Sequence, residues 1–153
     1  MKKNLFHYTQ SGLDYVYLSG GVIHEKNEYG DFFTIKDIDN LHHLIGHEII
    51  TSPRPLRGQE LRFLRSLIDC SQKTLGELMG VTRDTLAKHE ADRNKQLPGP
   101  MDRMLRVIYV NRTGNNKALQ EIMRLLDEIA EQEYQRDLKL THRKDSWEKP
   151  KAA

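Results

Sequence analysis

The sequence predicts a mainly α-helical protein with a small α+β module at its N-terminus. Apolar residues recur at helical spacing after residue 58, whereas the first fifty residues contain short β-forming runs separated by glycines. Pro53 and Pro55 separate the two regions. We therefore divide the chain into four parts: an α+β module over 1–52, a helical domain over 53–114, an amphipathic helix over 115–136, and a charged tail over 137–153 that we expect to be disordered.

The first half of the N-terminal module is expected to form strands. Tyr15–Leu18 and Val22–His24 are β-forming runs on either side of Gly20-Gly21, a pair that predicts a hairpin because tight two-residue turns need positive φ. A turn within 27–31 then leads to a third expected strand, Phe32–Ile35.

The second half of this module is expected to be a helix. Its apolar residues repeat at steps of three and four, with Asp37 or Asp39 as the N-cap. The stripe consists of Leu41, Leu44, Ile45 and Ile49. Pro53 and the residue before it resist helix, so we interpret 51–57 as a linker.

The remainder of the chain is predicted to be helical. Ser71 and Thr82 are suited to N-caps, Gly80 and Gly114 to helix ends, and Pro100 to a first helical position. These signals and the apolar spacing give five helices, over 59–68, 72–79, 83–90, 100–114 and 116–135.

Residues 71–90 carry the functional signal. Two short helices that cross steeply need a small residue at the crossing, which Gly76 supplies, and a left-handed turn between them, which Gly80 supplies. Thr82 then starts the second helix at once. Apolar residues for a shared core accompany them: Leu75, Met79, Val81 and Leu86. This combination is typical of a helix-turn-helix.

At these residues the sequence resembles the Xre, or lambda-repressor-like, family. The family pattern is Ser-Gln, two residues, Leu and a small residue, followed by Gly-Val-Ser/Thr and a later Glu. Here it runs from Ser71 to Glu90, and 61–65 fits the first helix of the family. The resemblance implies a five-helix lambda-repressor-like domain that binds DNA.

A wider resemblance extends over roughly residues 6–110. The segments 6–8, 11–14, 16–18 and 58–65 look like those of MqsA/YgiT-type regulators and antitoxins. Those relatives usually begin with a zinc-binding cysteine module, but this chain has a single cysteine, Cys70. It also has Gly76 in place of the more usual Ala, His89 in place of an apolar residue, and Ala91-Asp92 where a Gly commonly ends the helix.

The predicted DNA-contacting residues lie at the starts of the two helices and along the outer face of the second. The outer face consists of Arg83, Asp84, Thr85 and Lys88. The resemblance implies that Asp84 and Lys88 read bases. Lys88 can donate to the O6 or N7 of guanine, whereas the carboxylate of Asp84 can only accept and would favour the N4 donor of cytosine. It also implies that Gln72 and Thr82 contact phosphates. Further candidates for phosphate contacts are Arg54, Arg57, Arg62 and Arg93.

The charge distribution agrees with a nucleic-acid partner but does not require one. Residues 53–114 hold nine Arg and three Lys against seven acidic residues, a net charge of +5, whereas residues 1–52 carry −3. One module reads few base pairs, so the expected partner is a palindromic double-stranded DNA operator bound by a homodimer. The apolar stripe of 116–135 could join two subunits or pack on its own domain.

Three enzymatic or metal-binding interpretations are weaker. His43 and His47 have metal-ligand spacing but no third ligand at a diagnostic distance. Arg83 and His89 match the spacing of one ribonuclease superfamily, but the helix-turn-helix explains the same residues and their neighbours. Cys70 precedes a helix cap without a partner histidine. We expect no metal, no cofactor and no enzymatic activity.

Two functions follow from these patterns. The first is a sequence-specific DNA-binding transcriptional regulator that acts as a repressor. The alternative is an antitoxin that neutralises a toxin through residues 1–52 and autoregulates its operon. No apolar run approaches ~18 residues and no secretory signal is present at the N-terminus, so we expect a cytoplasmic protein without a membrane partner.

Overall fold

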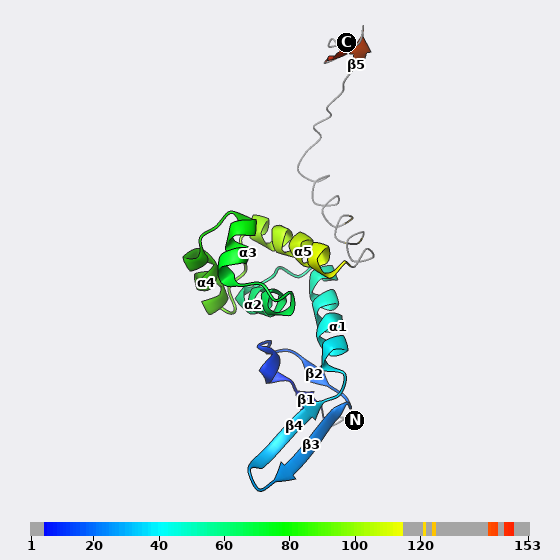
Figure 1. The fold of residues 1–153 in the computed structure, drawn as a ribbon, viewed down its shortest axis with the longest axis vertical. Coiled ribbons are helices and arrows are strands. Elements are labelled where there is room, and N and C mark those ends of the chain that lie inside the picture. The colour runs from blue at the N-terminus through cyan, green and yellow to red at the C-terminus, as the bar shows by residue number, and fades with distance from the viewer. Residues whose placement is uncertain (1–4, 115–120, 122–123, 125–140, 144–145, 149–153) are drawn as a thin grey trace. The chain divides into compact units, whose positions relative to one another are not determined.

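Residues 5–114 form five α-helices and two short, two-stranded antiparallel sheets (Figure 1). The structure, a computed structural model, describes residues 5–114, 121, 124, 141–143 and 146–148. The helix expected over 115–136 and its apolar stripe lie outside the continuously described residues. No helix among the described residues is long and apolar enough to cross a membrane. The mainly α class with a small α+β module is confirmed at this level.

Two separate sheets form the first part of the chain. Strand β1 (Phe6–His7) pairs with β2 (Tyr17–Leu18), and the 3-10 helix η1 (Thr9–Ser11) lies in the connection between them. Strand β3 (Val22–Asn27) pairs with β4 (Gly30–Ile35) along six residue pairs.

The predicted hairpin across Gly20-Gly21 is therefore wrong. Both glycines do have positive φ, 79° and 72°, but they turn the chain from one sheet into the next. β3 instead pairs with β4 across a two-residue turn, and each of the six residues of β3 has a partner in β4. β2 is held by β1, where the ring of His7 stacks on Tyr17 at 4.4 Å.

Helix α1 (Ile38–Thr51) follows β4, and Asp37 lies at its N-cap position. The Asp37 carboxylate accepts no backbone N–H of the helix. It accepts instead from the side-chain amide of Asn40 at 3.1 Å. The inner face of α1 buries Ile49 and Ile50.

Four helices follow within 53–114: α2 (Gly58–Leu67), α3 (Gln72–Met79), α4 (Arg83–Ala91) and α5 (Gly99–Thr113). Each begins and ends within one residue of the predicted bounds. Their shared core contains side chains that have no exposed surface: Leu61, Leu64, Leu75, Leu86 and Leu105. The fifth helix of the expected domain falls in 116–135, outside the continuously described residues.

The segment 51–57, which we expected to be a linker, is fixed by a buried arginine of α5. The Arg106 guanidinium donates to the carbonyl oxygens of Ile50, Ser52 and Arg54 at 2.7 to 2.8 Å and to Asp102 at 2.7 Å. The other carboxylate oxygen of Asp102 accepts the backbone N–H of Leu56 at 2.7 Å. Helix α5 therefore holds the connection in place.

Residues of the N-terminal module also contact α2 and the turn after α4. Gln59, 2% exposed, accepts the backbone N–H of Asp14 at 3.2 Å and donates to the side chain of Asn94 at 3.2 Å. Arg93 donates to the carbonyl oxygen of Gly12 at 2.8 Å. The module of 1–52 and the helices of 53–114 thus belong to one compact unit.

A second unit contains one described hairpin. Strand β5 (Thr141–Arg143) pairs antiparallel with β6 (Ser146–Glu148). Thr141 and Trp147 of this hairpin are residue types that favour strands. The expectation of a disordered tail over 137–153 stays a prediction.

Candidate nucleic-acid interface

The corner between α3 and α4 depends on two glycines. A Cβ built on Gly76 would lie 2.8 Å from the carbonyl oxygen of Val81, so any larger residue would force the two backbones apart. Gly80 has φ of 74°, and the N–H of Val81 then closes the turn onto the carbonyl oxygen of Gly76 at 2.9 Å. The roles predicted for both glycines agree with this geometry.

Both predicted caps are confirmed. The Ser71 hydroxyl accepts the backbone N–H of Thr74 at 3.0 Å, which satisfies a free donor at the start of α3. The Thr82 hydroxyl accepts the backbone N–H of Thr85 at 3.1 Å at the start of α4. Only three residues, Gly80, Val81 and Thr82, therefore separate the two helices.

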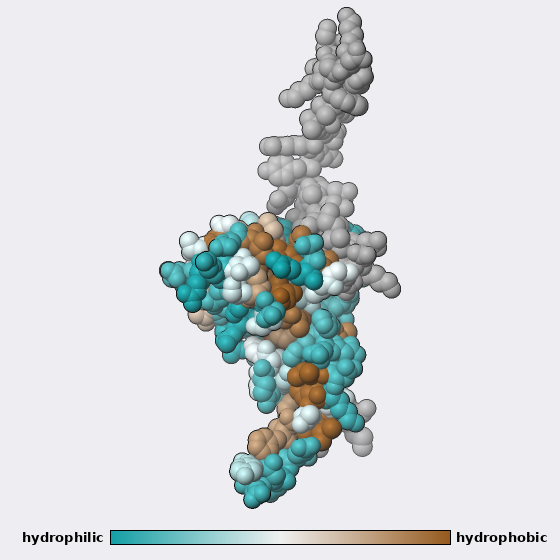
Figure 2. Space-filling model, viewed as in Figure 1, coloured by the Kyte–Doolittle hydropathy of each residue, from teal (hydrophilic) through white to brown (hydrophobic). Residues whose placement is uncertain are grey.

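Helix α4 has one buried and one exposed face. Leu86 has no exposed surface and Glu90 is 6% exposed, so this side packs against the other helices. Arg83, Asp84 and Lys88 are exposed, and Asp84 and Lys88 lie one helical turn apart. The surface over α4 is largely hydrophilic, at the left of the view in Figure 2. Three of the six predicted DNA-contacting side chains, all on α4, are thus exposed. Asp84 and Lys88 share the side opposite Leu86, whereas Arg83, at the first position of the helix, lies only about 60° around the axis from Leu86.

The two threonines of the predicted site bind each other. The Thr82 hydroxyl donates to the Thr85 hydroxyl at 2.9 Å, in addition to accepting its backbone N–H. Thr82 is exposed whereas Thr85 is half-buried. Of the two, Thr82 is better placed to meet a ligand at the start of α4.

Gln72, the sixth predicted residue, is held by a buried ion pair that the sequence analysis missed. Its amide donates to Oε2 of Glu90 at 2.6 Å, and Arg65 of α2 forms a bidentate pair with the same carboxylate. Arg65 also donates to the carbonyl oxygen of Cys70 at 3.0 Å. One amide N–H of Gln72 is therefore committed to the fold. Arg65 and Glu90 lie 25 residues apart, so no local spacing signals the pair.

The excess positive charge of 53–114 lies entirely on exposed side chains. Three arginines of this segment pair with acidic residues: Arg57 with Glu60, Arg65 with Glu90, and Arg106 with Asp102. The other charged side chains of 53–114 are all exposed, nine basic and four acidic. The basic set is Arg54, Arg62, Lys73, Arg83, Lys88, Arg93, Lys95, Arg103 and Arg112. The buried pairs are neutral, so the net +5 is available at the surface.

The four further arginines predicted to contact phosphates divide into two pairs. Arg54 and Arg62 are exposed. Arg57 pairs with Glu60 at 3.0 Å and lies 5.5 Å from the centre of the Tyr15 ring, whereas Arg93 donates to Gly12. Arg57 and Arg93 therefore connect the helices to the N-terminal module.

One histidine of α1, His42, has a packing role in the structure. Nε2 of His42 lies 2.8 Å from the Tyr8 hydroxyl, and its ring meets the edge of Phe63 at 5.8 Å between centroids. Burial lowers the pKa of His42, because the charged form loses hydration there. Among the described residues, no three His, Cys, Asp or Glu side chains gather as metal ligands, and Cys70 is buried as a free thiol.

No family model, curated protein or solved structure matches this chain. The function must therefore be inferred from the geometry and charge of the chain itself.

Proposed function

We propose that the protein is a sequence-specific DNA-binding transcriptional regulator in which α3 and α4 form a helix-turn-helix. The observation that carries the proposal is the exposed pair Asp84 and Lys88 on the side of α4 opposite the buried Leu86, with exposed Arg83 at the start of the same helix. A helix of this kind fits the major groove of B-DNA, where its outer side chains meet base edges.

The side-chain chemistry assigns different roles to these three exposed residues. Lys88 and Arg83 donate to the O6 and N7 acceptors of guanine or to phosphates, whereas Asp84 accepts from cytosine N4 and disfavours a nearby phosphate. Thr82 and the second amide N–H of Gln72 lie at helix N-termini, where the backbone dipole also attracts phosphate.

The exposed excess of five positive charges supports the phosphate contacts that such binding needs. A single module covers few base pairs, so we propose a homodimer on an inverted repeat with half-sites about one helical turn, ~34–36 Å, apart. Occupying a promoter in this way would repress transcription.

The test is selection of bound duplexes from a random DNA pool by the full chain. The proposal predicts that the selected duplexes share an inverted repeat, and that the logarithm of their affinity falls linearly with the logarithm of salt concentration. The double variant Arg83→Ala, Lys88→Ala should fold and should no longer enrich duplexes that share a sequence. Selected duplexes without a common sequence would contradict sequence-specific binding.

A second function, toxin neutralisation through residues 1–52, is favoured by a different surface. The β3–β4 hairpin exposes large apolar side chains that a folded chain usually covers: Ile23 at 38%, Tyr29 at 84%, Phe32 at 46% and Phe33 at 50%. Such a surface suits a protein partner.

This alternative is tested by copurification with the protein encoded next to it. Ile23→Ser with Tyr29→Ser should abolish copurification and leave DNA selection intact, because neither residue lies in the helices of 53–114. Copurification that survives this double substitution would place the partner surface elsewhere.

A further inference from the structure

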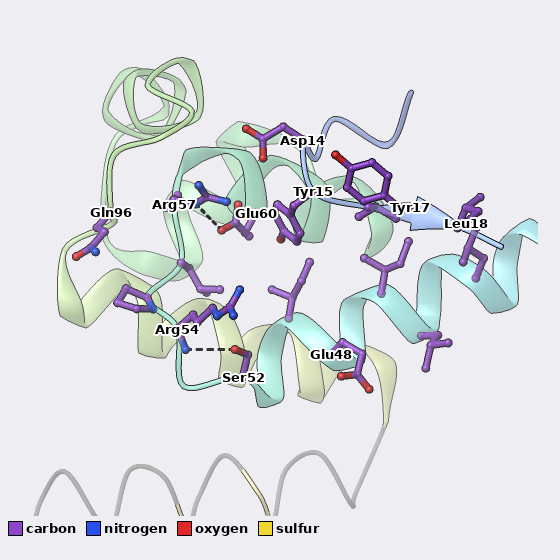
Figure 3. Close-up of a pocket in the computed structure, with 17 residues that line it drawn as sticks. Asp14, Tyr15, Tyr17, Leu18, Glu48, Ser52, Arg54, Arg57, Glu60 and Gln96 are labelled. Carbon is purple, nitrogen blue, oxygen red and sulfur yellow. Dashed lines mark hydrogen bonds and ion pairs between the residues drawn. The ribbon is translucent and has the colours of Figure 1, made fainter. Parts of the chain in front are cut away.

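A groove of about 840 Å³ lies between the β2 region, helix α1 and the start of α2 (Figure 3). Its wall is mainly apolar and includes Leu18, Leu41, Ile45 and Leu56. Arg57, Glu60 and Tyr15 lie together at one end (Figure 3). Grooves of this volume and lining are common binding sites for small organic molecules.

Glu60 places an unpartnered carboxylate oxygen at that end. The residue is 5% exposed, and Oε1 accepts from Nε of Arg57 at 3.0 Å. Oε2 is buried and has no hydrogen-bond partner among the described residues. A buried carboxylate oxygen without a donor is costly, so a donor supplied by a ligand would relieve that cost. Burial raises the pKa of Glu60, and this effect is larger than the lowering that its partner Arg57 causes.

The charges around the groove favour a cationic ligand. Three carboxylates line it, those of Asp14, Glu48 and Glu60, against the two guanidinium groups of Arg54 and Arg57. Arg57 and Glu60 pair with each other, so their charges offset and Asp14 and Glu48 remain against Arg54. A net negative lining with one free acceptor fits a group that brings both a positive charge and an N–H.

We propose that this groove binds a small organic cation, a primary ammonium on an apolar body, with the ammonium donating to Oε2 of Glu60. The apolar body would lie along α1 against Leu41 and Ile45. Oε2 is buried, so the ammonium reaches it only after a neighbouring side chain moves, and in this proposal that side chain is Tyr15, which lines the same groove. Tyr15 is 42% exposed, and exposed side chains change rotamer rapidly.

Backbone hydrogen bonds join the wall that contains Glu60 to the chain segment after α4. Arg57 forms an antiparallel bridge with Gln96. The N–H of Gly58 donates to the carbonyl oxygen of Lys95 at 3.3 Å, and that of Gln59 to the carbonyl oxygen of Arg93 at 3.2 Å. A ligand at Glu60 would therefore act on the segment that positions the end of α4. This regulatory consequence rests on the proposed DNA binding, whereas the binding site itself does not.

The test is a titration of the isotopically labelled full chain with 4-phenylbutylamine in the absence of DNA. The chemical shifts of the backbone amides in NMR spectra are the readout. The amine should shift amides of 14–18, 41–49 and 54–60 and saturate, with a dissociation constant on the order of 1 mM for so small a compound. The matched anion 4-phenylbutanoate should bind at least about tenfold more weakly, since it offers no donor to Glu60. Equal affinity for both compounds, or shifts confined to other residues, would overturn the proposal.

Two variants separate Glu60 from general negative charge. Glu60→Gln should weaken amine binding about tenfold, whereas Glu48→Gln, an exposed carboxylate of the same groove, should change it by less than about twofold. Equal effects of the two substitutions would overturn the role of Glu60. If Glu60→Gln does not fold, the comparison of 4-phenylbutylamine with 4-phenylbutanoate on the natural chain still tests the proposal. Because DNA is absent, a failure here leaves the proposed function untouched.

Discussion

Nε2 of Gln72, the first residue of α3, donates to Oε2 of Glu90, in the last turn of α4, across 2.6 Å. Arg65 of α2 holds the same carboxylate through two nitrogens. Three helices therefore meet at one buried acidic group, and the angle between α3 and α4 depends on this network as well as on apolar packing.

Replacing Glu90 by Gln is expected to lower the free energy of unfolding by about 3 kcal/mol, because it leaves the guanidinium of Arg65 in a largely buried place without its counter-charge. Urea unfolding followed by circular dichroism measures the loss. Glu77→Gln on the exposed side of α3 is the matched control and should stay within about 0.5 kcal/mol. Equal losses in the two variants would show that the network is not structural.

Gly58→Ala should destabilise the protein by at least about 2 kcal/mol, because the added Cβ would meet the backbone carbonyl oxygens of His89 and Asp92. The control is Gly99→Ala in α5, where the Cβ meets only the flexible end of Arg103 at 3.2 Å. That change should be neutral or slightly stabilising, since Ala favours helix over Gly. Thermal unfolding of both variants distinguishes the two positions. A Gly58→Ala protein as stable as the natural one would mean that α2 and the end of α4 are less closely packed.

Arg106→Lys is expected to release the connection between α1 and α2. A lysine cannot donate at once to three carbonyl oxygens and to Asp102, so buried acceptors at Ile50 and Ser52 lose their partners. The expected loss of stability is about 3 kcal/mol, accompanied by faster amide hydrogen exchange over 52–57 than over α3. Unchanged exchange in 52–57 would contradict a fixed connection.

The stability of the protein should fall as the pH drops below about 6.5, partly because of His42. Burial lowers the pKa of His42 in the folded state. The unfolded chain therefore binds the proton more readily, and stability is full above the unfolded pKa and decreases below it. His42→Gln should flatten the dependence of unfolding free energy on pH between 7 and 5. Parallel curves for the natural chain and the variant would exclude this contribution.

The parts of the fold that follow from local sequence were predictable. The caps at Ser71 and Thr82 and the turn at Gly80 each join residues no more than five positions apart, so local spacing alone places α3 and α4. The outward position of Asp84 and Lys88 follows from the same helical period.

The parts that depend on distant partners were not predictable in this way. The pairing of β1 with β2 joins residues ten and twelve positions apart, and the glycine pair carries no information about that partner. Arg65 and Arg106 look like surface cations in the sequence, and their buried partners become visible only when the helices are packed. The free oxygen of Glu60 is likewise a property of packing.

The most direct test of DNA readout by α4 is the affinity of Lys88→Ala for the selected duplex and for random duplex of equal length, at one salt concentration. Lys95→Ala removes an equal, exposed charge after α4 and serves as the control. Loss of Lys88 should narrow the preference for the selected duplex by about 1–3 kcal/mol, whereas loss of Lys95 should weaken both duplexes alike. A Lys88→Ala protein that keeps the full preference would contradict the placement of α4 in the major groove.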